Sequence, residues 1–196
     1  MITSGITLRQ GQPEDAPEIA RLIMTAMSEE CCRHFYGDKH TADDFHSLIT
    51  NLCKKPDTQY CHANTICATA ADKIVGISVS YDGGRLHELR QHFIDEVLKR
   101  FGRDFSDIAD ETQEGELYLD SLAVLPEYRG QGIAKSLLTA TAERARRMGI
   151  DAVGLLVDKG NPSAEHLYTS VGFRYVDDNI WGGHEMKHLQ LYPTLH

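Results

Sequence analysis

The first half of the chain alternates between helical and strand-like spacing of its apolar residues. Residues 6–10 have the pattern of a short strand, and Pro13 followed by two acids opens a helix. The apolar positions of that helix recur every three or four residues: Ile19, Leu22, Ile23, Ala26 and Met27. A second helix is predicted over 41–53, with Thr41 as N-cap and Asp44 as capping-box partner. Residues 65–70 and 74–81 are typical of two antiparallel strands joined by a tight turn.

The second half of the chain predicts strands and helices in alternation. An amphipathic helix is expected over 85–101, and the acidic residues 104–116 are expected to form a solvated surface loop. Then follow a strand at 117–124, a helix at 133–148, a buried strand at 152–157, a helix at 163–170 and a closing strand pair between 172 and 189. A strand–helix–strand connection implies a parallel pair, whereas the earlier hairpin is antiparallel. We therefore predict an α/β or α+β fold with a mixed sheet.

The composition narrows the class of protein. At 196 residues the chain is long enough for one domain, 1–196, that buries a core without disulfide or metal support. No apolar run approaches the roughly 20 residues that cross a membrane, and a net charge of −9 disfavours nucleic acid as a partner. Five cysteines without a C-x-x-C pair, and a start unlike a signal peptide, predict a cytoplasmic protein. Cys31, Cys32 and the scattered histidines lack zinc-like ligand spacing, so we assign no metal.

A glycine-rich turn between the strand at 117–124 and the helix at 133–148 is the strongest chemical signal. Glycines before the unpaired amides of a helix start form a cradle for phosphate. A dinucleotide fingerprint is incomplete because Lys135 occupies its third glycine position, and a P-loop is incomplete because Ala134 stands where it needs glycine. The turn fits the pattern Q/R-x-x-G-x-G/A, which holds the pyrophosphate of coenzyme A. A glycine-rich helix start without a ligand is the structural alternative.

The surrounding sequence resembles the GNAT superfamily of acyl-CoA-dependent N-acetyltransferases. Residues 117–134 are similar to the core motif of that family, and residues 161–168 with Gly172-Phe173 are similar to its second motif. The similarity is good from 117 to 189 and weaker from 6 to 81. It implies a sheet whose central strand splays from its neighbour and leaves a V-shaped cleft for acetyl-CoA.

The resemblance implies which residues hold acetyl-CoA, the co-substrate. The pantetheine arm is expected along Leu122, Ala123 and Val124 and beside Asn161. The pyrophosphate is expected on the turn and the start of the following helix, at Arg129, Gly130, Gln131, Gly132, Ile133 and Ala134, with Lys135 and Ser136 nearby.

The resemblance also implies a general acid that protonates the leaving thiolate, and it points to a general base for the amine. Tyr168 occupies the general-acid position of the family, where a phenol can protonate the leaving thiolate. Asp120 is the first choice for the base because it lies two positions before Leu122, which puts both side chains on one face of a regular strand. Glu116 shares that parity at a greater distance. Asp120 can remove the proton directly, bind a cationic acceptor or order a water, and the sequence leaves these three roles open.

One segment departs from the family pattern. Roughly thirty residues, 82–115, stand where the family has a short turn, and insertions of this length are uncommon unless functional. The insertion can cover the acceptor site, form a dimer contact or bury its helix face against the domain. The early helices, with His34, Phe35 and Tyr36, are expected to line the acceptor side.

The sequence therefore predicts acetyl transfer from acetyl-CoA to a primary amine of a small molecule or protein, by direct attack in a ternary complex. A non-catalytic acyl-CoA-binding sensor or regulatory module is the alternative, and a P-loop nucleotide-binding protein is a third class. Neither nucleic acid nor a membrane is expected as a partner, and the sequence leaves a homodimer open.

Overall fold

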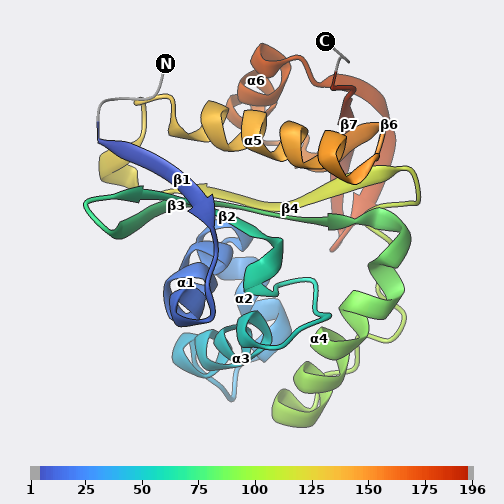
Figure 1. Ribbon diagram of the computed structural model, residues 1–196. Coiled ribbons are helices and arrows are strands. Elements are labelled where there is room, and N and C mark those ends of the chain that lie inside the picture. The colour runs from blue at the N-terminus through green and yellow to red at the C-terminus, as the bar shows by residue number, and fades with distance from the viewer. Residues whose placement is uncertain (1–4, 194–196) are drawn as a thin grey trace.

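The computed structural model describes residues 5–193 and builds them around one seven-stranded sheet (Figure 1). The strands are β1 (Ile6–Gln10), β2 (Thr65–Ala70), β3 (Lys73–Asp82), β4 (Glu116–Val124), β5 (Ala152–Asp158), β6 (Arg174–Trp181) and β7 (His184–Leu191). Their spatial order is β1-β2-β3-β4-β5-β7-β6, and every neighbouring pair is antiparallel except β4 and β5. The predicted mixed sheet is confirmed.

Within the described residues, six α-helices cover the two faces of this sheet. They are α1 (Ala16–Met27), α2 (Glu29–Tyr36), α3 (Ala42–Lys54), α4 (Leu86–Phe101), α5 (Ile133–Met148) and α6 (Pro162–Val171). Helices α1 to α4 lie on one face and α5 and α6 on the other, so the sheet is the middle of three layers (Figure 1). Between residues 5 and 193, no helix has the length and apolar character needed to cross a membrane.

The predicted elements match the observed bounds closely, and α2 is the exception. α3 begins at the predicted Thr41 cap, where the hydroxyl accepts the Asp44 amide and the Asp44 carboxylate accepts the Thr41 amide. The sequence analysis assigns no bounds to α2, because the helix is only eight residues long and its apolar residues form just two pairs, Cys31-Cys32 and Phe35-Tyr36. Ser28 starts this helix by accepting the Cys31 amide, and Gly37 ends it with a φ of 72°.

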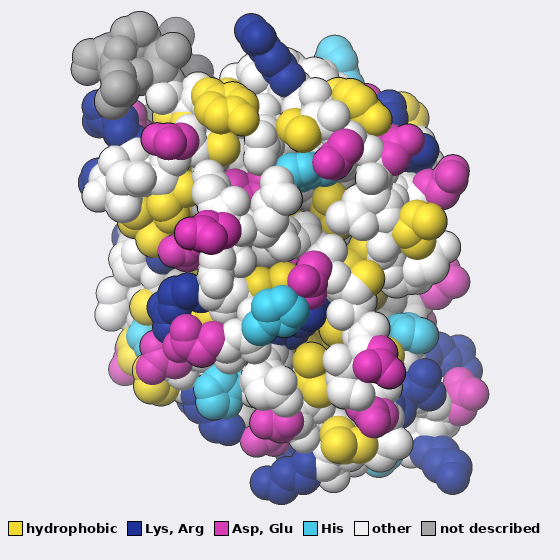
Figure 2. Space-filling view, turned by 90° about the vertical axis from the view of Figure 1, so that its right-hand side faces the viewer, with side chains coloured by type: hydrophobic (Ala, Val, Ile, Leu, Met, Phe, Trp, Pro, Cys, Tyr) yellow, Lys and Arg dark blue, Asp and Glu magenta, His cyan; other side chains and the backbone are white. Residues whose placement is uncertain are grey.

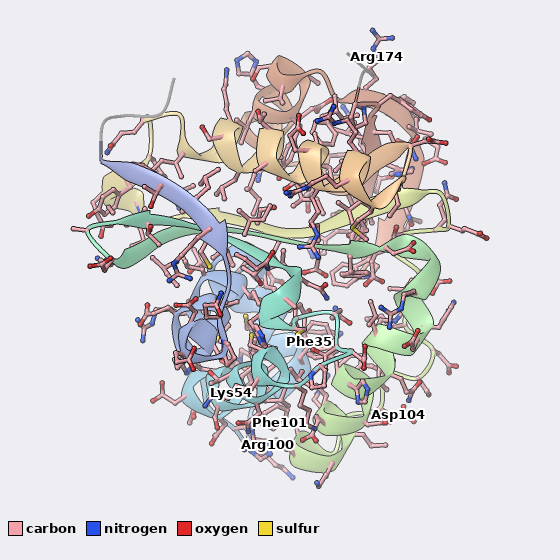
Figure 3. The ribbon with its side chains drawn as sticks, in the orientation of Figure 1. Phe35, Lys54, Arg100, Phe101, Asp104 and Arg174 are labelled. Carbon is pink, nitrogen blue, oxygen red and sulfur yellow. The ribbon has the colours of Figure 1, made fainter. Side chains whose placement is uncertain are left out.

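Two apolar layers hold the helices on the sheet. On the α1–α4 side, Phe35, Phe45 and Phe93 join α2, α3 and α4, and the ring centroids of Phe35 and Phe93 are 4.9 Å apart. Figure 3 shows Phe35 inside this helical layer. On the other side, Leu119 of β4 packs with Leu138 of α5. Each fully buried side chain of this kind contributes roughly 1.5–3 kcal/mol, so both layers fix the position of β4.

The insertion supplies α4 and the irregular segment 102–115 that follows it. The helix buries five apolar residues: Leu86, Leu89, Phe93, Ile94 and Val97. Of the three roles expected for the insertion, burial against the rest of the molecule is therefore the one that α4 fulfils.

The acidic segment is not the fully solvated loop that its composition predicts. Glu111 is 4% exposed, and Glu116 is completely buried as the first residue of β4. Arg90 of α4 donates to Glu111 Oε2 at 2.6 Å and to Asp110 Oδ1 at 2.8 Å, and Tyr81 of β3 donates to Glu111 Oε1 at 3.3 Å. Burial raises the pKa of the Glu111 carboxyl, and the Arg90 guanidinium opposes that rise. The expectation is wrong for Glu111 and Glu116 because donors from α4, β3 and β7 reach these two carboxylates and allow them to be buried.

Breaking the buried Arg90–Glu111 pair is expected to destabilise the protein. Arg90→Met leaves the Glu111 carboxylate buried without its cation, so the free energy of unfolding should fall by about 3–5 kcal/mol in chemical denaturation. Combining Arg90→Met with Glu111→Gln removes the stranded charge and should recover much of the loss. Arg100→Met, at an exposed position of the same helix, is the control and should leave the unfolding midpoint nearly unchanged. An equally small change of the unfolding free energy in Arg90→Met and in Arg100→Met would contradict a stabilising role for the Arg90–Glu111 pair.

Candidate active site

Strands β4 and β5 form a short parallel pair and then separate. Their pairing covers three positions of β4, from Glu116 to Tyr118. Beyond these positions β4 runs on to Val124 and β5 to Asp158 along diverging paths. Within residues 5–193, nothing pairs as a strand with the β5-facing backbone of residues 119–124. This divergence is the V-shaped opening that the sequence resemblance implies.

Glu116 closes the narrow end of this opening. Its carboxylate accepts hydrogen bonds from Thr112 Oγ1 at 2.7 Å, Gln190 Nε2 at 2.7 Å and His188 Nε2 at 2.8 Å. The carboxylate occupies the space beside Gly154 of β5, where a Cβ would overlap its oxygens. Glu116 is therefore satisfied within the protein and ties β4 to β7 across β5.

A β-bulge in β4 places Asp120 on a different face of the sheet from the predicted one. The pairing of β4 with β3 shifts between Leu119 and Ser121, so Asp120 is the extra residue. Leu119 and Leu122 are three positions apart, yet both belong to the apolar layer under α5. The Asp120 carboxyl instead lies on the α1–α4 side, against Gln59. The prediction that Asp120 and Leu122 share one face is wrong, because it assumed a regular strand.

Two hydrogen bonds hold the Asp120 carboxyl in a partly buried position. Ser121 Oγ donates to Oδ1 at 2.8 Å, and Gln59 Nε2 donates to Oδ2 at 3.4 Å. Burial, with a smaller contribution from the charge of Glu111, raises the pKa of Asp120 to about 7, and the two hydrogen bonds oppose this rise. A carboxyl that titrates near neutral pH can take a proton from a bound group and release it again.

Tyr168 approaches β4 from the opposite face, on α6. Its ring packs against Phe173 with centroids 5.8 Å apart, and it belongs with Leu122 to the apolar layer under α5 and α6. Burial raises the pKa of Tyr168 to about 12, so the phenol keeps its proton at neutral pH and can act as a donor. Asn161 caps α6, where its Oδ1 accepts the Ala164 amide at 3.1 Å.

The glycine turn leads into α5 as the sequence predicts. Gly130 and Gly132 have φ values of 75° and 79°, a conformation that glycine adopts without strain. A Cβ at Gly130 would meet no atom within 4 Å, so the outer side of the turn is open. The first amides of α5 have no partner within the helix, and they carry its positive dipole end. The turn therefore offers a set of donors to an anionic group.

The side chains around the turn brace it. Arg129 Nε donates to the Val124 carbonyl at 3.1 Å, so this guanidinium lies back over the end of β4. Ser136 Oγ donates to the Gly132 carbonyl at 3.1 Å within the first turn of α5. Lys135 is exposed beside them. Arg129 and Lys135 are both exposed, so both can present a cation to an anion on the turn.

A groove of about 1130 Å³ opens between α2, the insertion and the turn that joins β6 to β7. His34 and Phe35 of α2 line it, together with Phe105 from the insertion and Trp181 from β6. Segment 103–109 therefore forms one wall of the groove, in addition to the packing role of α4. The insertion thus contributes both to the core and to a cavity.

Cys31 connects this groove with Asp120. It lines the groove, and burial, followed by the charge of Asp120, raises the pKa of its thiol to about 11. Asp120 itself does not line the groove, and Cys31 is the lining residue on which its charge acts. Two buried N–H groups of the lining, Arg103 Nε and Trp181 Nε1, have no hydrogen-bond partner among the described residues. Tyr36 packs against Phe45 and lines a second cavity, with Met24 and His46, rather than this groove.

The groove carries more acidic than basic groups. Four carboxylates and two guanidiniums line it: Glu30, Asp38, Asp104, Asp107, Arg33 and Arg103. Figure 2 shows acidic and basic side chains and histidines interspersed over the face that carries α4, with hydrophobic side chains scattered among them. With a net charge of −9 for the chain, this surface favours the approach of a cation.

Two residues around Asp120 have no sequence signal that marks them. Gln59 lies 61 positions away in the chain and meets the carboxyl only through folding. Glu111 belongs to an acidic segment, and the sequence does not distinguish it from the exposed carboxylates because its partner Arg90 lies on α4. Both contacts depend on where α4 and the segments around it pack.

The comparisons with known proteins agree with this geometry. The model of the acetyltransferase (GNAT) family matches residues 24–173, and the chain belongs to this family of acetyl-transferring enzymes. The crystal structure of an acetyltransferase is similar with a TM-score of 0.78 and 29% identity, over 96% of this chain and 100% of the other. The protein yncA from Salmonella typhimurium, solved with its cofactor acetyl-CoA, shares the fold with a TM-score of 0.58 and 16% identity, over 98% of this chain and 96% of that one.

Curated relatives are similar over shorter stretches. A mycothiol acetyltransferase from Propionibacterium freudenreichii subsp. shermanii is 32% identical over 88 residues, which is 44% of this chain and 28% of the relative. A ribosomal protein bS18-alanine N-acetyltransferase from Haemophilus ducreyi is 43% identical over 61 residues, 31% of this chain and 42% of the relative. The matched stretch thus spans less than half the length of either relative.

The raised pKa of Asp120 makes the stability of the protein depend on pH. The carboxyl titrates near its ordinary value of 3.8 in the unfolded chain and near 7 in the folded one, so between these values only the folded state holds the proton. This contribution to stability is complete below about pH 4 and is lost as the pH rises through 7. We expect Asp120→Asn to be more stable than the wild type at pH 8 and nearly equal to it at pH 4 in urea denaturation. Lower stability of the variant at pH 8 would contradict the raised pKa.

Proposed function

We propose that this protein transfers an acetyl group from acetyl-CoA to a primary amine of a small molecule or protein. The observation that carries the proposal is a carboxyl with a pKa near 7, held on a bulge where β4 separates from β5. The glycine turn at the end of the same strand supplies the donors that a pyrophosphate needs. Membership of the acetyltransferase family agrees with both features.

The donor side follows from β4 and the start of α5. The pantetheine arm would lie along the strandless edge of β4, at Leu122, Ala123 and Val124, with Asn161 beside it. The Val124 carbonyl already accepts from Arg129, so the amides of this edge are the groups left to contact the arm and polarise the thioester carbonyl. The pyrophosphate would lie on the turn and the first amides of α5: Arg129, Gly130, Gln131, Gly132, Ile133 and Ala134, with Lys135 and Ser136 at its side. The open space at Gly130 fits this assignment.

The acceptor side follows from the groove that Cys31 lines, since the charge of Asp120 acts on this residue. The amine would enter along the walls formed by Phe35 and Phe105, which suit an apolar portion, and past the carboxylates of the rim. The relatives are named for a small thiol compound and for a ribosomal protein, so acceptors of both sizes occur among them. We therefore expect a cationic acceptor with an apolar portion.

The reaction would proceed by direct attack in a ternary complex. The cationic acceptor first loses one proton to water and reacts as the neutral amine. Its nitrogen lone pair forms a bond to the thioester carbonyl carbon, and Asp120 takes a second proton from the nitrogen. The C–S bond then breaks, and the Tyr168 hydroxyl gives its proton to the leaving thiolate sulfur. The products are an N-acetylated amine and free CoA. The pKa values of about 7 for Asp120 and about 12 for Tyr168 match these two roles.

The alternative is a protein that binds acyl-CoA as a sensor and catalyses nothing. The placement of Asp120 and Tyr168 favours the enzyme, because the two groups lie on opposite faces of β4 where it separates from β5, as a base and an acid for acetyl transfer would.

The direct test is to incubate the pure protein with acetyl-CoA and a panel of primary amines while free thiol release is followed. The proposed function expects turnover with at least one cationic amine that carries an apolar portion. Tight CoA binding without turnover across a broad panel would favour the sensor.

Tyr168→Phe is expected to lower kcat by about 10²–10⁴-fold, because the thiolate then leaves without its proton donor. The Kd of CoA in calorimetry is expected to stay within about twofold, since the ring still packs against Phe173. Tyr175→Phe, at an exposed position of β6, is the matched control and should change neither quantity. Parallel losses of kcat and of CoA affinity in Tyr168→Phe would mean that the hydroxyl serves structure rather than proton transfer.

A further inference from the structure

Gln59 lies beside Asp120 in a loop that several elements hold in place. Its backbone amide donates to the Leu89 carbonyl of α4 at 3.3 Å, and Asn64 Nδ2 donates to its carbonyl at 3.3 Å. Thr58, the residue before it, donates through Oγ1 to the Leu52 carbonyl of α3 at 2.9 Å. Gln59 is 3% exposed, so its side-chain amide has a fixed position next to the carboxyl.

The two ends of the Gln59 amide have different surroundings. Nε2 donates to Asp120 Oδ2 at 3.4 Å, whereas Oε1 is buried and has no hydrogen-bond partner among the described residues. Exchanging the oxygen and nitrogen positions would set a carbonyl oxygen against an ionised carboxylate, so the observed orientation is the favourable one when Asp120 is charged. A buried acceptor without a donor is costly to a protein, and such groups are often completed by a ligand.

We propose that Gln59 Oε1 and the Asp120 carboxylate together receive the two N–H groups of a primary amine, and that Gln59 thereby selects primary over secondary amines. This inference rests on the proposed function, in which Asp120 is the base. A neutral primary amine has two N–H groups and one lone pair. One N–H would donate to Asp120 and the other to Gln59, which leaves the lone pair for the thioester carbon.

The roles of the two protons follow from the chemistry of the transfer. When the N–C bond forms and the C–S bond breaks, the proton on the Asp120 side goes to the carboxylate. The proton on the Gln59 side stays on nitrogen and becomes the N–H of the acetamide product. A secondary amine has one N–H, so its second substituent would stand against Gln59 Oε1 and leave that oxygen without a donor. Gln59 is thus a specificity-determining residue that also positions the base.

The groups that face Asp120 come from five segments. The charge of Asp120 acts on four groups that are neutral at neutral pH: the Cys31 thiol of α2, the Tyr60 hydroxyl of the loop after α3, the Tyr81 hydroxyl of β3 and the Tyr118 hydroxyl of β4. Glu111 of the insertion is the charged neighbour, and Arg90 pairs with it. Burial raises the pKa of each thiol or hydroxyl in this set, so none of these four groups titrates with Asp120 near pH 7.

The test replaces Gln59 by methionine, which has a similar shape and neither donates nor accepts strongly. Acetylation of 2-phenylethylamine and of its N-methyl derivative is compared in the wild type and in Gln59→Met across pH 6–9. We expect the KM for the primary amine to rise about tenfold, equivalent to about 1.4 kcal/mol, while kcat changes by less than about threefold. The preference for the primary over the N-methyl amine is expected to shrink by about the same factor. Gln91→Met, at an exposed position of α4, is the control and should behave like the wild type.

A second measurement follows the Asp120 carboxyl itself by ¹³C NMR and needs no substrate. Loss of the Gln59 hydrogen bond removes an effect that lowers the pKa of Asp120, so the titration midpoint is expected to move to higher pH in Gln59→Met. A change in folding stability alone would not move this midpoint.

The outcomes separate this inference from the proposed function. Unchanged amine selectivity in Gln59→Met, or an unmoved Asp120 midpoint, overturns the role of Gln59 even if the wild type is an active acetyltransferase. If the wild type acetylates neither amine, the proposed function fails for this amine class, and the NMR midpoint still decides whether Gln59 positions the carboxyl.

Discussion

The separation of β4 from β5 after Tyr118 is the constraint on which the rest of the site depends. Two parallel strands would continue to pair unless something ended the ladder, and the bulge in β4 follows directly after the last pairs. At the narrow end, the buried Glu116 carboxylate fills the space beside Gly154 and is held by donors from β7 and from Thr112. Two positions beyond the last pair, the bulge at Asp120 changes the direction of the side chains. The backbone edge of β4 is left for a ligand, and the carboxyl is directed into the helical layer on the other face.

The insertion determines the electrostatics of that carboxyl. Asp120 would titrate as an ordinary surface acid if the α1–α4 side were open to water. Helix α1 packs against β4 on this side, and α4 with the segment after it brings the Arg90–Glu111 pair into the interior and holds the backbone of Gln59. The pair is nearly neutral as a unit, so it can be buried, but its carboxylate still acts on Asp120. The same segment supplies Phe105 to the groove. In our account, one insertion thus shapes both the reactivity of the base and the wall of the acceptor site.

Local patterns predict much of the fold and of the donor turn. The ends of α5 follow from Gly132 and Gly149, which the sequence shows directly, and the start of α3 follows from its capping box. The positive φ values in the glycine turn follow from the motif. The face on which Asp120 lies could not be predicted, because a bulge depends on the register with β3 and not on the residues of β4 alone. Gln59 could not be predicted either, since its contact with Asp120 exists only after α3 and α4 have packed. The roles of Asp120, Tyr168 and the residues of the turn stay predictions.

We propose that the opening between β4 and β5 receives the acetyl donor, with Asp120 as the base on one face of the sheet and Tyr168 as the acid on the other. A crystal structure of the protein with CoA tests it most directly. The account predicts pantetheine density along residues 122–124, pyrophosphate oxygens within hydrogen-bond distance of the amides that begin α5, and the CoA sulfur within reach of the Tyr168 hydroxyl. CoA bound away from this opening, or a Tyr168 hydroxyl turned away from the sulfur, would contradict it.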